Sequence, residues 1–177
     1  INTHIGIDLG INALATCSTG NMYGSDIKEC VARVKRCKHG SNGQKTARRA
    51  LRQRIDEITK ELITKENPDL VVVEQLKNLG HKTKDKRLLS KNIRRSIGIW
   101  NWRYWLTRLE QQCEENRVSF RSVSPYNTSI TCSNCGHADR MNRQSQECFC
   151  CQKCGHTDNA DINASRNILS RFILGKY

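Results

Sequence analysis

Two Cys-x-x-Cys pairs near the end of the chain constrain its fold more than any other feature. Cys132 and Cys135 form the first pair, Cys151 and Cys154 form the second, and fifteen residues separate the two pairs. This spacing is typical of a zinc ribbon, in which each pair forms one knuckle and four thiolates hold one Zn²⁺ tetrahedrally. We therefore predict a small insert, residues 125–157, that depends on one structural zinc ion.

Other residues of the insert leave the zinc register open. Cys148 also forms a Cys-x-x-Cys pair with Cys151, and Cys150 is close enough to substitute for a neighbour. His137 and His156 each follow a complete Cys-x-x-Cys-Gly, so we expect them at the surface. The ribbon is either an inert brace or a contact for nucleic acid through basic side chains. Those side chains are Arg140, Arg143 and Lys153.

The charge of the chain indicates a nucleic-acid partner. Its 177 residues include 30 Lys and Arg against 17 Asp and Glu, a formal net charge of +13, and such a surplus attracts polyphosphates. No stretch has the ~18 to 20 apolar residues of a membrane span, and the first residues lack the features of a signal peptide. We expect a cytoplasmic protein, prokaryotic or phage-encoded, with no membrane partner. Because the sequence begins without Met and inside a predicted strand, we also expect a processed chain or the downstream part of a longer protein.

Apolar periodicity predicts an α/β fold with a mixed sheet flanked by helices. Residues 3–10 alternate, with Ile5 and Ile7 on one face and Gly6 and Asp8 on the other, which predicts a buried strand. Short strands within 12–19 and 22–25 would complete an antiparallel meander. Residues 28–45 are basic and interrupted by Gly and Ser, and we assign no helix to them.

The second half of the pattern alternates helices with strands. An amphipathic helix is predicted by the spacing of Leu51, Ile55, Ile58 and Leu62, and Pro68 ends it. The apolar run 69–74 predicts a strand that is covered on both faces and parallel to the first. The remaining expected elements are a helix within 91–116, a strand at 118–123 and a helix at 159–172.

Three acids fall where ligands bind in such a fold. Asp8 and Glu74 end strands that we expect to be parallel, and Asp161 opens the last helix. Carboxylates brought together repel one another unless a cation neutralises them, and oxygen ligands suit Mg²⁺ or Mn²⁺. Two such ions can clamp a phosphodiester. The alternative is that Asp8 and Asp161 only cap a turn and a helix, while Glu74 pairs with a nearby Lys.

The motifs around these acids resemble a known family. The segments are GIDLG at 6–10, VVVEQL at 71–76 and DINASRNI at 161–168, the last directly behind the cysteine pairs. They resemble the three split RuvC motifs of transposon-encoded TnpB proteins and type V CRISPR effectors. The approach to the ribbon, residues 124–136, looks like the same family.

The resemblance implies an RNase H-like (RuvC) nuclease domain formed by residues 1–124 and 158–177 around the inserted ribbon. It further implies a DNA endonuclease that uses two Mg²⁺ or Mn²⁺ ions bound by Asp8, Glu74 and Asp161. Asp158 competes for the third position, but the D-x-N-A pattern favours Asp161. Expected partners are single-stranded or unwound DNA and, if an upstream region exists, a guide RNA. Two alternatives stay open: a catalytically inactive zinc-ribbon module that binds nucleic acid, and a junction-resolving nuclease of RNase H-like fold.

Basic side chains form two clusters suited to phosphate contacts. One cluster lies opposite the apolar stripe of the predicted helix, and the other lies in the loop after Glu74; the alternative for each is a solvated face. The candidates are Lys45, Arg48, Arg49 and Arg52 in the first cluster and Lys82, Lys84, Lys86, Arg87, Lys91, Arg94 and Arg95 in the second. The aromatic residues at 100, 102, 104 and 105 have helical spacing, so we expect most of them in the core rather than stacked on bases.

Overall fold

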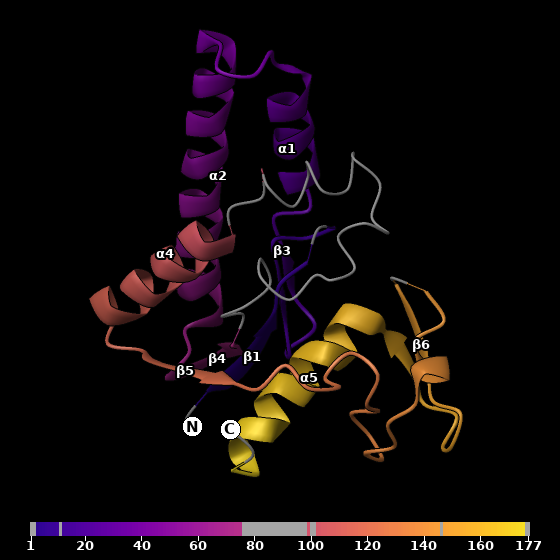
Figure 1. The fold of residues 1–177 in the computed structure, drawn as a ribbon. Coiled ribbons are helices and arrows are strands. Elements are labelled where there is room, and N and C mark those ends of the chain that lie inside the picture. Colours follow the sequence, from indigo (N-terminus) through magenta and orange to yellow (C-terminus); the bar gives the residue numbers. More distant parts are fainter. Residues whose placement is uncertain (1–2, 11, 76–98, 100–101, 146, 176–177) are drawn as a thin grey trace.

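A mixed five-stranded sheet forms the centre of the computed structural model, which describes residues 3–10, 12–75, 99, 102–145 and 147–175 (Figure 1). The strand order is β3-β2-β1-β4-β5. The strands are β1 (His4–Asp8), β2 (Ala15–Cys17), β3 (Met22–Tyr23), β4 (Leu70–Glu74) and β5 (Ser119–Val123). The first three strands pair antiparallel, as the predicted meander requires, although β2 and β3 are shorter than expected. β4 pairs parallel to both β1 and β5, which confirms the predicted parallel strand.

The register brings the ends of β1 and β4 to one edge of the sheet. Ile7 lies opposite Val73, and Glu74 lies opposite Val123. Asp8 and Glu74 are therefore the last residues of two neighbouring parallel strands. In open α/β sheets, ligands bind outside these carboxyl ends.

Helices cover both faces of the sheet (Figure 1). One face packs against α1 (Ile27–Arg36), α2 (Asn42–Glu66) and α4 (Trp102–Glu115), and the other packs against α5 (Ala160–Ile173). β4 is buried on both sides because Val71 and Val73 join the larger core, whereas Leu70 and Val72 pack with Ile168 of α5. No described helix is both long and apolar enough to cross a membrane.

A glycine sets the distance between α5 and the sheet. A Cβ on Gly6 would lie 2.2 Å from the backbone oxygen of Ser165 and 2.8 Å from the backbone nitrogen of Leu169. Any side chain at this position would push the helix away. Because Asp8 lies two residues further along β1, on the same face as Gly6, this close approach also brings the first turn of α5 near Asp8.

The structure corrects the interpretation of residues 28–45. Most of this segment belongs to α1 or to the first turn of α2, and α2 begins nine residues before Leu51, the first member of the predicted stripe. Ile27, Val31 and Val34 are buried at helical spacing, so an apolar stripe was present among the basic residues. The start of α2 also carries a sequence signal, because the Ser41 hydroxyl accepts a hydrogen bond from the Gln44 backbone.

The cysteine-rich insert has little apolar core of its own. It contains a 3₁₀ turn (Arg140–Asn142) and β6 (Cys148–Cys150), which pairs antiparallel with β7 (Thr157–Asn159) where the insert ends. Phe149 packs with two cysteines and Ala160. Burying one Phe contributes about 3 kcal/mol at most. Ordering each residue costs about 1–2 kcal/mol of backbone entropy. An insert of this length therefore needs a further source of stability.

Candidate metal centres

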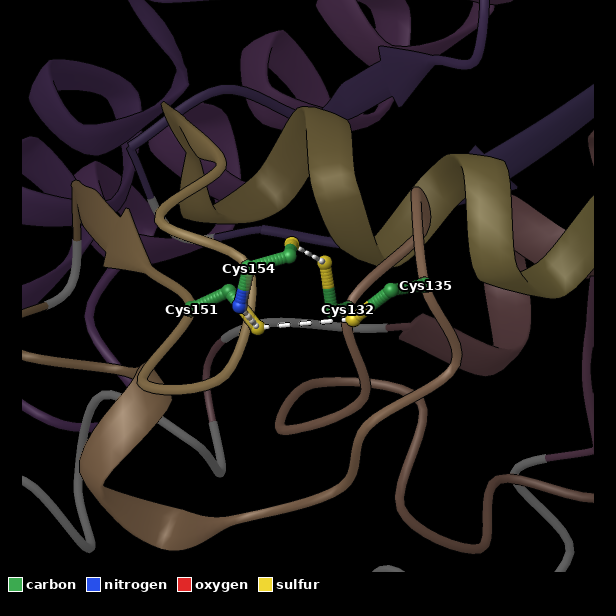
Figure 2. Close-up of side chains that lie close together, drawn as sticks. All are labelled: Cys132, Cys135, Cys151 and Cys154. Carbon is green, nitrogen blue, oxygen red and sulfur yellow. Dashed lines mark hydrogen bonds between the residues drawn. The ribbon is translucent and has the colours of Figure 1, made fainter.

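The four paired cysteines form a compact cluster (Figure 2). Their sulfur atoms all lie within 4.8 Å of one another. The Sγ atoms of Cys132 and Cys154 are 3.8 Å apart, and those of Cys135 and Cys151 are 3.6 Å apart. These distances exceed a disulfide bond, which is about 2.05 Å long. They match the edge of a tetrahedron with Zn–S bonds of about 2.3 Å, which is about 3.8 Å, so the residues present fit one zinc ion.

The two halves of the cluster repeat one backbone pattern. In each, the first cysteine donates its N–H to the carbonyl of the histidine after the knuckle, at 2.8 Å for both Cys132 and Cys151. Gly136 and Gly155 donate back to the same cysteines at 2.9 and 3.0 Å. Both glycines have positive φ, 74° and 71°, which explains why the tight turn takes Gly.

The structure groups the same four cysteines that the spacing pairs, and it leaves the other two outside. Cys148 and Cys150 lie on β6, and Cys148 is exposed. The imidazole of His156 lies beside Asp158, at 3.8 Å. Among the described residues, this cysteine group is the only set of three or more His, Cys, Asp or Glu ligand atoms close enough together to hold one ion.

The three predicted acids line a second, wider site. Asp8, Glu74 and Asp161 border one cavity of about 290 Å³ at the carboxyl edge of the sheet. Asp161 lies in the first turn of α5, where the side chain of Asn159 accepts hydrogen bonds from the Asp161 and Ile162 backbones at 2.9 and 3.3 Å. The acids thus come from three distant segments. Among the described residues, the oxygen atoms of these acids do not form a set as compact as the four cysteine sulfurs.

The electrostatics of this cavity favour a cation. The pKa of Asp8 is raised from 3.8 to about 8, mainly by burial and then by the negative charges of Glu74 and Asp161. Burial also raises the pKa of Glu74. A divalent cation would reverse this penalty by pairing with the charged carboxylates. Oxygen donors in a partly buried, negatively charged cavity therefore fit Mg²⁺ or Mn²⁺.

Two side chains from the segment after β5 complete the cavity. The Thr128 hydroxyl donates a short hydrogen bond to Oε1 of Glu74. Nη2 of Arg143 lies 3.2 Å from Oδ1 of Asp161, and the positive charge of Arg143 partly offsets the rise in the pKa of Asp8. The sequence indicated Arg143 only as a basic residue of the ribbon, and it indicated no role for Thr128.

The competing acid occupies a different environment. Asp158 forms a short ion pair with Arg166, and its Oδ1 accepts a hydrogen bond from the Asn159 backbone at 2.8 Å. Asp161, not Asp158, borders the cavity with Asp8 and Glu74. The geometry thus favours Asp161 as the third acid.

The first basic cluster lies along one side of α2. Its members recur at i, i+3, i+4 and i+7, which places them on one helical face, and they lie in the half of α2 further from the sheet (Figure 1). Lys45, Arg49 and Arg52 are exposed, and the Arg52 guanidinium stacks 5.5 Å from the centre of the Tyr104 ring. The second cluster, Lys82 through Arg95, lies outside the described residues.

The aromatic residues of α4 divide between core and surface. Trp105 is fully buried, whereas Trp102 and Tyr104 are partly buried, and the Tyr104 hydroxyl donates to Asp56 at 2.9 Å. Trp100 lies outside the described residues. The expectation that most of these rings lie in the core is therefore met in full only by Trp105.

Comparisons with known proteins identify relatives. The sequence model for the TNB domain of Cas12f1-like proteins matches residues 102–168. InsQ of Escherichia coli (strain K12), named as an RNA-guided DNA endonuclease, is 31% identical over 194 residues, which cover 94% of this chain and 48% of InsQ. The CRISPR-associated endodeoxyribonuclease Cas12f1 of Sulfoacidibacillus thermotolerans is 37% identical over 79 residues, or 42% of this chain and 19% of that protein. These matches confirm the relationship to the TnpB and type V CRISPR effector family that the motifs predict.

A solved structure shares the fold. The Cas12f1 chain in a cryo-EM structure with sgRNA and target DNA aligns with a TM-score of 0.67 at 22% identity, over 94% of this chain and 49% of that chain. The present chain thus spans about half of the length of InsQ and of this Cas12f1 chain.

Proposed function

We propose that this chain is the nuclease portion of an RNA-guided, TnpB-like or type V CRISPR-like effector, and that it cleaves DNA with two divalent metal ions. One observation carries the proposal. Asp8, Glu74 and Asp161, which lie in the three motifs that resemble the family, border one cavity at the carboxyl edge of the parallel strands. The strand order and the helices on both faces support an RNase H-like (RuvC) fold for residues 1–124 and 158–177, with residues 125–157 as its zinc-ribbon insert.

The residues of the cavity have distinct roles in this proposal. Asp8, Glu74 and Asp161 would hold two Mg²⁺ or Mn²⁺ ions, and such a pair supplies Lewis-acid stabilisation of the attacking and leaving oxygens of a phosphodiester. Arg143 holds Asp161 and adds positive charge where a phosphate would lie. The four clustered cysteines would hold one structural Zn²⁺. That site is closed by four protein ligands, which suits a brace and not a reaction centre.

The proposed partners follow from charge and from the relatives. Both InsQ and Cas12f1 have names that describe DNA cleavage. We therefore propose single-stranded or unwound DNA as the substrate and a guide RNA as a partner of the longer protein, with the basic clusters contacting phosphates. We also propose a cytoplasmic location.

The test combines cleavage with metal binding. Labelled single- and double-stranded DNA is incubated with zinc-loaded protein in Mg²⁺ or Mn²⁺, and Mn²⁺ binding is measured in parallel by electron paramagnetic resonance. The variants are Asp8→Asn, Glu74→Gln and Asp161→Asn, with Asp158→Asn as the matched control. Each cavity variant should lower cleavage at least about a thousandfold, because several kcal/mol of transition-state stabilisation are removed, and it should weaken Mn²⁺ binding.

The control separates the competing interpretations. Asp158→Asn should keep both DNA cleavage and Mn²⁺ binding. If instead Asp158→Asn loses cleavage while Asp161→Asn retains it, Asp158 and not Asp161 is the third acid. Equal Mn²⁺ binding by the wild type and Asp8→Asn would contradict the proposal. If Mn²⁺ binds and DNA binds with a steep salt dependence but is never cut, restoring the rest of the protein decides between an incomplete nuclease and an inactive binding module.

A further inference from the structure

We propose that Thr128 is a positioning residue that holds the Glu74 carboxylate for metal binding, and that two buried asparagines of α5 fix Thr128 in place. This inference rests on the proposed function. It goes further by assigning a role to a segment, residues 124–131, that joins β5 to the cysteine cluster.

The first step is the contact between Thr128 and Glu74. Thr128 is only 3% exposed, and its hydroxyl donates to Oε1 of Glu74. Glutamate has one more side-chain torsion than aspartate, so its carboxylate is harder to keep in one orientation. Asp161 is held by Arg143, which also lines the cavity. The hydrogen bond from Thr128 restrains the Glu74 carboxylate in the same way.

The second step is what holds Thr128. Nδ2 of Asn167 donates to the carbonyl oxygens of Thr128 and Thr131, at 2.9 and 2.6 Å. One helical turn earlier, Nδ2 of Asn163 donates to the same Thr131 oxygen at 2.8 Å, and its Oδ1 accepts the Ser133 N–H at 2.9 Å. The 128–133 backbone is thus pinned at three points.

The third step is the rigidity of this support. Asn163 is 0% and Asn167 is 6% exposed, and asparagine is unfavourable inside helices. Both Nδ2 groups and the Oδ1 of Asn163 bond to the backbone of the 128–133 segment, so the pair forms a buried polar network. Ser133 directly follows Cys132, which connects the network to the cysteine cluster. Because Gly6 lets α5 lie directly on β1, the helix that pins Thr128 is itself seated on the strand that ends in Asp8.

A purely structural role for Thr128 makes a different prediction. Its hydroxyl also lies 3.3 Å from the Pro125 carbonyl, so it contributes to the fold of its own loop. Thr128→Val keeps the shape and removes the hydroxyl, whereas Thr128→Ser keeps the hydroxyl. Thr131→Val is the matched control, because the Thr131 hydroxyl donates to the Asn127 carbonyl at 2.7 Å, in the same segment.

The experiment measures Mn²⁺ binding to the zinc-loaded chain by electron paramagnetic resonance, with thermal unfolding without Mn²⁺ as the measure of folding. Thr128→Val should weaken Mn²⁺ binding about tenfold to a hundredfold, the usual effect of losing an outer-shell partner of a metal ligand. Thr128→Ser and Thr131→Val should bind like the wild type. Where DNA is cleaved, Thr128→Val should raise the Mn²⁺ concentration for half-maximal rate more than it lowers the rate at saturating Mn²⁺.

The other outcomes contradict either the role of Thr128 or the proposed function. Wild-type binding by Thr128→Val, together with loss in Asp8→Asn, would overturn the role of Thr128 and leave the proposed function intact. Equal weakening by Thr128→Val and Thr131→Val would assign the effect to loop packing and also overturn it. Equal Mn²⁺ binding by the wild type and Asp8→Asn would contradict the metal site itself, and with it the proposed function. Should Thr128→Val fail to fold, Thr128→Ala removes the same hydroxyl and allows the same comparison.

Discussion

The cysteine cluster and the carboxylate cavity are assembled in opposite ways. All four cysteines lie between residues 132 and 154, and each pair closes its own tight turn with the same hydrogen bonds. The three acids lie at residues 8, 74 and 161, and the cavity needs two strand ends, a helix start and a loop from the insert. The difference shows that a site made of local turns can be identified from spacing, whereas a site made of distant strand ends depends on the order of the sheet.

The two centres also differ in how their negative charges are arranged. Four thiolates around one ion form a closed shell that leaves no position for a substrate. The cavity instead keeps three acids together beside one arginine, and it raises the pKa of Asp8 to about 8. From this contrast we expect the first centre to stabilise the insert, and we propose the second as the reaction centre. The network of Asn163 and Asn167 links them, since it holds the loop that carries Thr128.

The largest expected effect is the loss of zinc. Cys151→Ser should release the ion, and the insert should lose its fold, because structural zinc sites supply about 10–16 kcal/mol of binding energy in small domains. The control is Cys148→Ser, which alters an exposed cysteine of the same insert outside the cluster. Zinc content by mass spectrometry and limited proteolysis of residues 125–157 measure the outcome. Equal zinc loss in both variants would mean that the ion uses another register.

An intermediate effect concerns the pH dependence of stability without Mg²⁺ or Mn²⁺. The pKa of Asp8 is raised from 3.8 to about 8 in the fold, so the folded protein binds this proton more tightly than the unfolded chain does. Stability contributed by this group must therefore fall as the pH rises from about 4 to about 8. Between pH 6 and 8, the loss should be about 2 kcal/mol, at about 1.4 kcal/mol per pH unit.

Asp8→Asn is the matched comparison for this pH effect. The variant carries no titrating group at this position, so its free energy of unfolding should change less over the same range in urea titrations. Saturating Mn²⁺ should also flatten the wild-type profile, because a bound cation favours the charged carboxylate. Parallel profiles for the wild type and Asp8→Asn would show that Asp8 is not the group responsible.

The smallest expected effect lies away from both centres, on α2. Replacing Lys45, Arg48 and Arg49 with Gln should leave zinc content and Mn²⁺ binding unchanged and should make DNA binding less dependent on salt. Removing one phosphate-binding charge lowers the slope of log K against log salt by about 0.7 to 0.9. Fluorescence anisotropy at several salt concentrations measures the slope. Arg54→Gln is the control, because Arg54 pairs with Asp26 at 2.7 Å, and an equal change in slope there would indicate general charge effects.

Much of the sheet and both sets of metal-ligand candidates could be predicted from the sequence. The alternation around Asp8 and the apolar run before Glu74 are strong signals, because burial on one face or on both leaves a clear period. The helix at 27–36 was missed because basic residues surround Ile27, Val31 and Val34 and mask a three-residue stripe. The basic residues of this helix lie on its exposed side, whereas the three buried apolar residues pack against the core and determine that the segment is helical.

The sequence by itself determined the cysteine pairs, the strand that ends in Asp8, the buried strand that ends in Glu74, and the family motifs that contain all three acids. Only the tertiary structure decided that these acids share a cavity, that Asp161 and not Asp158 borders it, and that Thr128 and Arg143 hold two of them. The physical reason is the separation in sequence between the residues that interact. Local turns and periodic burial act between neighbours in sequence, whereas the cavity depends on parallel pairing of β1 with β4 and on the close seating of α5 at Gly6.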